Sequence, residues 1–111
     1  MIEKIYSFTR TDDRVIEKII ADDNLAINHM VLKKGQALPQ HFSNSNVYMV
    51  IISGTVTLQL ADQPAQCYPA GTIVNIPYNI KMNLSNQHEE TLEFFVVKAP
   101  SPSFFERGKS R

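Results

Sequence analysis

His41 is the residue of this chain whose setting most suggests chemistry. It lies in the stretch GQALPQHFSNSNVYMVIISG, residues 35 to 54, where a polar loop connects the histidine to an apolar strand. An imidazole can bind a metal ion or accept a proton near neutral pH. Ser43 follows two residues later and Val47 six residues later, and a valine side chain has no donor atom. The stretch thus has the layout of a metal-binding strand with one strong ligand.

The other reactive side chains add little to a metal centre or a nucleophile. Cys67 is the one cysteine of the sequence, so it can form no disulfide within the chain. Its neighbours are typical of a strand, and we expect Cys67 to be a small buried hydrophobic residue. His29 has the strand parity opposite to that of Met30, and His88 stands in a polar loop. We expect structural or surface roles for both histidines.

Length, composition and charge limit the class of protein. A chain of 111 residues is the usual size of one domain, and 43% apolar with 20% charged residues is typical of a globular one. Its 11 basic and 11 acidic residues balance, so we expect no nucleic-acid and no membrane partner. The N-terminus lacks the apolar stretch of a signal peptide, and the longest apolar run, residues 47 to 52, is too short to cross a bilayer. We therefore expect a cytoplasmic protein.

Most apolar residues of the chain follow the periodicity of strands. Residues 55 to 60 alternate between a polar and an apolar side chain, which is typical of a half-buried strand. Residues 13 to 20 fit a strand or a short helix, and we favour the strand because of its β-branched content and the hairpin that follows. Short strands separated by turn signals predict an all-β sandwich or small barrel. The other expected strands cover residues 25 to 32, 47 to 52, 72 to 76 and 91 to 97.

Gly35 and Gly54, and farther along the chain Gly71 and Pro77, are spaced as in the two sequence motifs of the cupin family, which the chain therefore resembles. The resemblance implies the cupin fold, a jelly roll that is also described as a double-stranded β-helix barrel. The matching positions are Gly35 and Gly54 in the first motif, residues 35 to 54, and Gly71 and Pro77 in the second motif, residues 71 to 86.

One departure from the second motif is informative about the backbone. Asn79 stands where the family has a glycine, and asparagine is the residue that best tolerates a left-handed conformation after glycine. The resemblance further implies a single cupin domain over residues 1 to 99, followed by a C-terminal tail at 100 to 111. Phe104 and Phe105 of this tail could dock on the barrel or on a second subunit.

Metal-binding cupins hold a divalent ion with two histidines, a glutamate and a third histidine that point into the barrel. The positions that match these four ligands are His41, Ser43, Val47 and Met82. A catalytic divalent metal usually has about three protein donors, and one imidazole with a weak thioether falls short of that number. We therefore expect no divalent metal and no cofactor. A soft ion such as Cu(I), bound by His41, Met82 and one more soft donor, stays an open alternative.

With the ligands replaced, the barrel is expected to enclose an apolar pocket that has a small polar corner. Strand alternation places Met49 on the same wall as Val47. The expected ligand-binding residues are then His41, Ser43, Val47, Met49 and Met82. Such a pocket suits a small, partly apolar molecule. Non-catalytic binding of such a molecule is the function we favour.

The same alternation predicts an apolar outer face on this strand. Tyr48, Val50 and Ile52 should point outward, and three large apolar groups in a row need a cover. The cover is either the chain's own outer sheet or a second subunit. Because cupins are commonly dimers, the resemblance favours a homodimer.

Two other functions stay open, so the sequence leaves enzymatic activity undecided. Some cupins are metal-independent isomerases or epimerases, and in such an enzyme His41 would be the general base. Tyr48 or Tyr78 would supply the proton from the other side if either ring reaches the pocket, but neither motif contains an Asp or Glu to orient the imidazole. The third function is a structural or assembly module whose barrel is filled by its own side chains.

Overall fold

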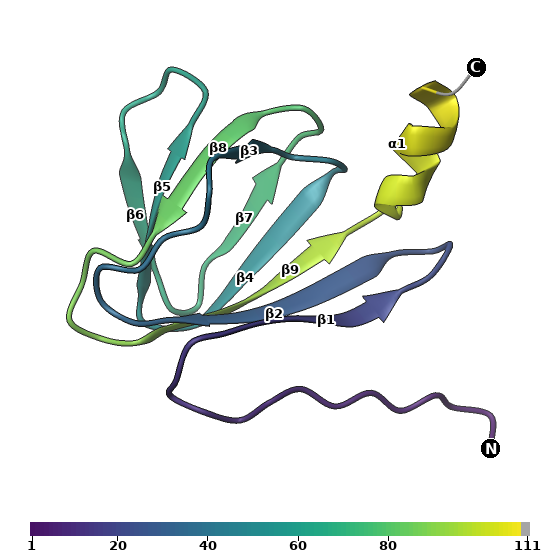
Figure 1. Ribbon diagram of the computed structural model, residues 1–111, viewed down its shortest axis with the longest axis horizontal. Helices are drawn as coiled ribbons and strands as arrows, with labels where there is room; N and C mark the ends of the chain where they lie inside the picture. The colour runs from purple at the N-terminus through teal and green to yellow at the C-terminus, as the bar shows by residue number, and fades with distance from the viewer. Residues whose placement is uncertain (110–111) are drawn as a thin grey trace.

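Turns divide the chain into short strands that form two antiparallel sheets in the computed structural model, which describes residues 1–109 (Figure 1). The first sheet has the order β1-β2-β9-β4-β7, with β1 (Val15–Ala21), β2 (Ala26–Leu32), β9 (Leu92–Lys98), β4 (Val47–Ser53) and β7 (Ile73–Ile76). The second has the order β3-β8-β5-β6, with β3 (His41–Phe42), β8 (Lys81–Ser85), β5 (Thr55–Leu60) and β6 (Gln66–Pro69). A helix, α1 (Pro102–Lys109), follows β9 at one open end of the two sheets (Figure 1).

The hydrophobic core lies between the two sheets because every second residue of the central strands is apolar and points inward. On β4, Val47 and Met49 are buried, whereas Tyr48 and Ile52 on the other face are partly exposed. Each large apolar side chain buried in this way stabilises the fold by roughly 1.5–3 kcal/mol. The all-β prediction is confirmed, and so are the predicted inner and outer faces of β4.

The segment with two competing predictions, residues 13 to 20, is a strand. Residues 15 to 21 form β1, which pairs with β2 and places Glu17 opposite His29. The helical alternative is wrong because an antiparallel partner follows directly after the turn at Asp22, whose side chain accepts hydrogen bonds from the backbone of Asn24 and Leu25.

One expectation is wrong, and one element was not predicted. Cys67 is exposed and not buried, because β6 is the edge strand of the second sheet. The segment expected to be a tail contains α1, whose Phe105 stacks on the ring of Tyr78 with a centroid distance of 4.1 Å. Phe105 thus docks on the barrel, while Phe104 is 55% exposed. Within residues 1–109 no helix has the length and apolar character needed to span a membrane.

Two turns require the kind of residue that the motifs place in them. Gly54, between β4 and β5, has φ +76°, and a Cβ there would lie 2.5 Å from the carbonyl oxygen of Thr91. No other residue fits this turn without moving the backbone of its neighbour. Asn79 has φ 65°, the left-handed conformation that its place in the motif predicts.

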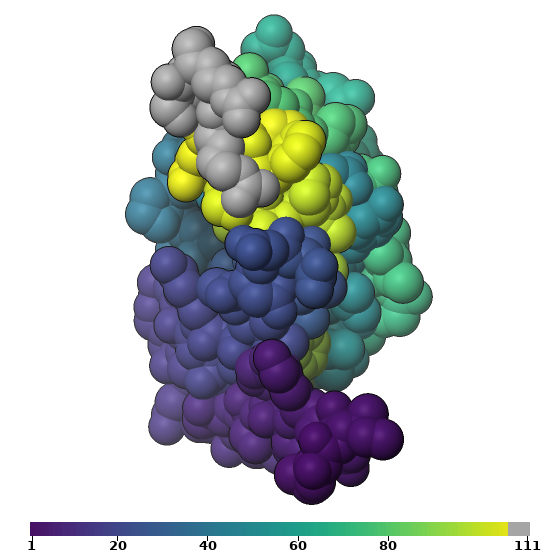
Figure 2. Space-filling view, turned by 90° about the vertical axis from the view of Figure 1, so that its right-hand side faces the viewer, coloured from purple at the N-terminus to yellow at the C-terminus, as the bar shows by residue number. Residues whose placement is uncertain are grey.

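Residues 1–10 form an extended segment, the N-terminal arm, which runs along the outside of the first sheet (Figures 1 and 2). The arm is fixed to the sheet at Thr9. The backbone N–H of Thr9 donates to Glu17 Oε2 at 2.8 Å, and its hydroxyl donates to Glu17 Oε1 at 2.9 Å. Beyond this point the large side chains of Ile2 and Ile5 are mostly exposed.

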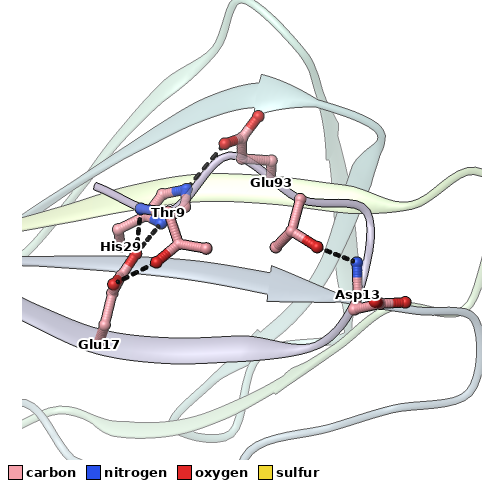
Figure 3. A network of polar contacts seen from close by, with 6 residues as sticks. Thr9, Asp13, Glu17, His29 and Glu93 are labelled. Carbon is pink, nitrogen blue, oxygen red and sulfur yellow. Dashed lines mark hydrogen bonds and ion pairs between the residues drawn. The ribbon is translucent and has the colours of Figure 1, made fainter. Parts of the chain in front are cut away.

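Beneath the arm, the imidazole of His29 is completely buried between two glutamates (Figure 3). Its Nδ1 lies 2.7 Å from Glu17 Oε2, and its Nε2 lies 2.7 Å from Glu93 Oε2. The rings of Phe8 and Phe95 pack against it with centroid distances of 4.9 and 4.8 Å. An ionised carboxylate only accepts hydrogen bonds, so both bonds form together when both ring nitrogens carry a hydrogen. These contacts give His29 a structural role.

The same hydrogen bonds keep the pKa of Glu17 below its ordinary value of 4.5. The backbone N–H of Thr9 has the largest effect, and the hydrogen bond with His29 is next. Both stabilise the ionised carboxylate in the folded chain. A carboxyl group with a lowered pKa adds stability at pH values above its ordinary pKa, and this stability is lost as the pH falls through the lowered folded value.

We predict that Glu17→Gln removes this part of the protein's sensitivity to acid. The variant should be less stable than the wild type near neutral pH, because the amide makes weaker hydrogen bonds with His29. It should then lose less stability than the wild type as the pH falls below 4.5. Urea unfolding at a series of pH values measures both effects. Glu3→Gln is the matched control, since exposed Glu3 has no hydrogen-bond partner among residues 1–109. An equal pH dependence in the wild type and Glu17→Gln would contradict the prediction.

Candidate functional site

The five predicted ligand-binding residues line one cavity of about 40 Å³ between the two sheets. They are His41, Ser43, Val47, Met49 and Met82. A cavity of this volume admits one or a few water molecules and no organic molecule. The fold therefore brings the predicted residues together, but it leaves no room for an organic ligand inside the barrel.

Strand pairing and alternation position these side chains. On the short strand β3, His41 lies opposite Met82 of β8. Val47 and Met49 enter from β4 in the other sheet, and their side chains are 2% and 0% exposed. Ser43 follows β3 directly and is also buried. The cavity is thus lined by groups from both sheets.

Ser43 is held by the loop that carries the second motif. Its hydroxyl donates to the carbonyl oxygen of Pro77 at 2.6 Å and accepts from the backbone N–H of Ile80 at 2.8 Å. Because a hydroxyl has one hydrogen to donate, that of Ser43 is already used. Ser43 therefore connects β3 to the loop before β8 and has only acceptor capacity left for a ligand.

His41 is exposed at the rim of the cavity and has one fixed hydrogen bond. Its Nδ1 lies 2.9 Å from the carbonyl oxygen of Pro39, which can only accept, so this contact assigns the ring hydrogen to Nδ1. The lone pair is then on Nε2. Tyr48 points to the outer face as the alternation predicts, so its ring does not meet the condition for donating a proton in the pocket. Tyr78 stacks on Phe105 instead of on His41.

The residues present do not fit a divalent metal ion. Among residues 1–109 no group of three or more His, Cys, Asp or Glu side chains could hold a metal. Val47 presents hydrocarbon where metal-binding cupins have a carboxylate, and the thioether of Met82 is a weak neutral donor for such ions. The imidazole of His41 can form one bond to a metal ion, whereas a catalytic divalent metal usually has about three protein donors.

Two larger hollows lie at the open end of the barrel, next to the first turn of α1. The lysine hollow, of about 240 Å³, is lined by residues of β1, β2, β9 and α1, including Lys18 and Lys98. The aromatic hollow, of about 260 Å³, is lined by Tyr78 and Phe105 among others. Asn44 lines both hollows and also the inner cavity. Figure 2 views this end, where the β1–β2 turn lies beside α1.

Lys98 lines the lysine hollow and was not predicted from the sequence as a site residue. Burial lowers the pKa of its ammonium group, and the nearby charge of Lys18 lowers it further. No ion pair of Lys98 occurs within the part of the chain that the structure describes. Strand alternation could have predicted that Lys98 points into the barrel. Phe94 and Val96 on the same strand point inward, so the residue at 98 should point the same way.

Comparison with known proteins identifies relatives of this architecture. No family model matches the chain. The chain is 48% identical over 103 residues to an uncharacterised protein of Methanocaldococcus jannaschii, a match that covers 92% of this chain and 89% of the relative.

Solved structures show the same fold. A crystal structure of an RmlC-like cupin family protein with a double-stranded β-helix fold, from Methanocaldococcus jannaschii, superposes with a TM-score of 0.93 and 46% identity, over 96% of this chain and 98% of that one. An uncharacterised Klebsiella pneumoniae protein with a double-stranded β-helix domain has a TM-score of 0.73 at 16% identity, over 86% and 84% of the chains, and shares the fold alone. At 46% identity over almost its whole length, the chain belongs to the cupin family of double-stranded β-helix proteins.

Proposed function

We propose that this cupin binds a small, partly apolar molecule with an acidic group at the open end of its barrel, without a divalent metal. The ligand would lie in the lysine and aromatic hollows, which together offer far more room than the inner cavity. Of the five residues predicted from the sequence, Ser43 lines the aromatic hollow, whereas the other four line the inner cavity and neither hollow. Non-catalytic binding is the function that this arrangement supports best.

The observation that carries the proposal is the unpaired, half-buried ammonium group of Lys98. Burying a cation costs free energy unless an opposite charge accompanies it. The like charge of Lys18 lowers the pKa of Lys98 further and makes this cost larger, and Glu106 also lines the lysine hollow without forming an ion pair with Lys98 among the described residues. An anionic ligand group in the lysine hollow would interact with both cations. The stacked rings of Tyr78 and Phe105 would receive the apolar part of the ligand.

A metal-independent isomerase or epimerase is the alternative function. It is favoured by the bond from His41 Nδ1 to the Pro39 carbonyl, which leaves Nε2 able to accept a proton. Against it, no carboxylate of the described residues contacts His41. The imidazole would therefore act as a base without an acidic partner, so we rank binding first.

We also propose that the protein is a homodimer, formed by the N-terminal arm and the outer face of the first sheet. The arm presents Ile2 and Ile5, and the outer face presents Tyr48, Ile52 and Ile73, all substantially exposed. A second copy of the chain can supply this cover, because each subunit carries both the arm and the outer face. A two-fold axis then places the arm of each subunit on the outer face of the other. The third function, a structural or assembly module, would use the same contact.

We predict that Lys98→Met weakens ligand binding and stabilises the unliganded protein. A thermal-shift screen of small carboxylates and phosphate esters should find compounds that raise the melting temperature saturably. Losing a hydrogen bond to a charged group costs about 1.5–3 kcal/mol, which is roughly a ten- to hundredfold loss of affinity. The unliganded variant should melt at a higher temperature, because a buried unpaired cation has been removed.

Lys34→Met is the matched control for this substitution. Lys34 is exposed and pairs with Glu89, and it lines neither hollow. The control should bind the same compounds as the wild type does. If no compound in the screen binds, the proposed function is wrong. If compounds bind Lys98→Met and the wild type equally, the ligand lies elsewhere.

We predict that the wild type is a dimer and that Ile2→Asp combined with Ile5→Asp makes it a monomer. A stable interface buries about 800 Å² on each partner, and two charges in its apolar strip would oppose that burial. Light scattering coupled to size-exclusion chromatography measures the mass. Glu3→Gln with Lys4→Gln changes the same arm at its polar positions and should stay dimeric. A wild type that is monomeric at every concentration would contradict the proposal.

A further inference from the structure

We propose that the inner cavity of the barrel is a site for one soft monovalent metal ion, Cu(I), held by His41 and three methionines. The sequence contains four methionines, of which Met1 lies in the N-terminal arm. The other three, Met30, Met49 and Met82, all line the cavity of about 40 Å³ that His41 also lines. The cavity adjoins the larger hollows at the open end of the barrel and shares Asn44 with both, but the three methionines line the cavity and neither hollow.

The three thioethers come from different strands and from both sheets. Met30 lies on β2, Met49 on β4 and Met82 on β8, and their side chains are 8%, 0% and 4% exposed. Methionine has three rotatable side-chain bonds, which lets these sulfur atoms adjust around a small ion.

His41 makes the kind of hydrogen bond that a metal-binding histidine usually makes. Such a histidine donates its other ring N–H to a carbonyl or carboxylate group, which fixes the ring. Here Nδ1 donates to the Pro39 carbonyl at 2.9 Å, so Nε2 is the atom able to bind an ion. Met82 lies directly opposite His41 in the pairing of β3 with β8. The nitrogen and one sulfur therefore come from adjacent strands.

The donors select the charge and the softness of the ion. Thioethers and a neutral imidazole carry no charge, and thioether sulfur is a ligand that suits Cu(I). No carboxylate or thiol lines the cavity, so nothing there would neutralise a doubly charged ion. Lys98 also lines it, and its positive charge repels a singly charged ion only half as strongly as a doubly charged one. The volume suits an ion better than any organic molecule.

The test uses Ag(I), which has the charge and softness of Cu(I) but is not oxidised in air, as the probe. The protein carries Cys67→Ser, because the exposed thiol of Cys67 would itself bind Ag(I). Methionine methyl groups labelled with carbon-13 are followed by NMR during the titration. The signals of Met30, Met49 and Met82 should move and stop moving at one equivalent. Met1, 97% exposed, serves as the internal reference and should not move with them.

Substitutions separate binding from packing. Met82→Leu and Met49→Leu keep the side-chain volume and should fold normally while weakening Ag(I) binding at least tenfold. His41→Gln should weaken it similarly, whereas His88→Gln, at an exposed loop residue, should not. Zn(II) should move none of the three buried methyl signals. The proposal is overturned if these signals stay fixed, if Met1 alone responds, or if the leucine variants bind as tightly as the parent.

Discussion

The alternation of side chains along β4 governs both what the barrel can hold and what it presents to other molecules. Val47 and Met49 point into the barrel and are buried, so they occupy the wall from which a carboxylate could have reached an ion. Tyr48 and Ile52 point outward and leave the sheet with an apolar outer face. A shift of one residue would exchange the two sets. Gly54 helps to prevent this shift, because its turn has no space for a Cβ.

The ion pairs of His29 lie on the outer face of the first sheet and not inside the barrel. There Glu17 and Glu93 satisfy both ring nitrogens and the arm covers them (Figure 3). The buried polar groups on that face are therefore paired. Lys98 differs because burial disfavours its charge and it forms no ion pair with any residue that the structure describes. This contrast is why we place ligand binding at the open end.

Much of the fold could be predicted from the sequence because its signals are local. Period-two patterning and turn residues determine the strands, and the left-handed turn at Asn79 follows from the side chain that stands there. The cupin motif positions of His41, Ser43, Val47 and Met82, with Met49 added by strand alternation, predicted five residues that line one cavity. The volume of that cavity could not be predicted, because it depends on how side chains of both sheets pack.

Other features depend on contacts between distant parts of the chain. The network of His29 joins residues 12 and 64 positions away, and only the strand order makes Glu17 and Glu93 its neighbours. Cys67 lies on a strand as expected, but the position of β6 at the edge of its sheet exposes the thiol. Helix α1 is short and is held by stacking of Phe105 on the barrel, which the local sequence does not reveal.

The central claim is that the four ligand positions of a metal-binding cupin, here His41, Ser43, Val47 and Met82, cannot hold a divalent ion. Elemental analysis of the purified, chelator-free protein by mass spectrometry tests this most directly. We predict zinc, iron and manganese far below one equivalent per chain, even after incubation with each metal and desalting. About one equivalent of any of them, bound at the centre of the barrel, would contradict the account.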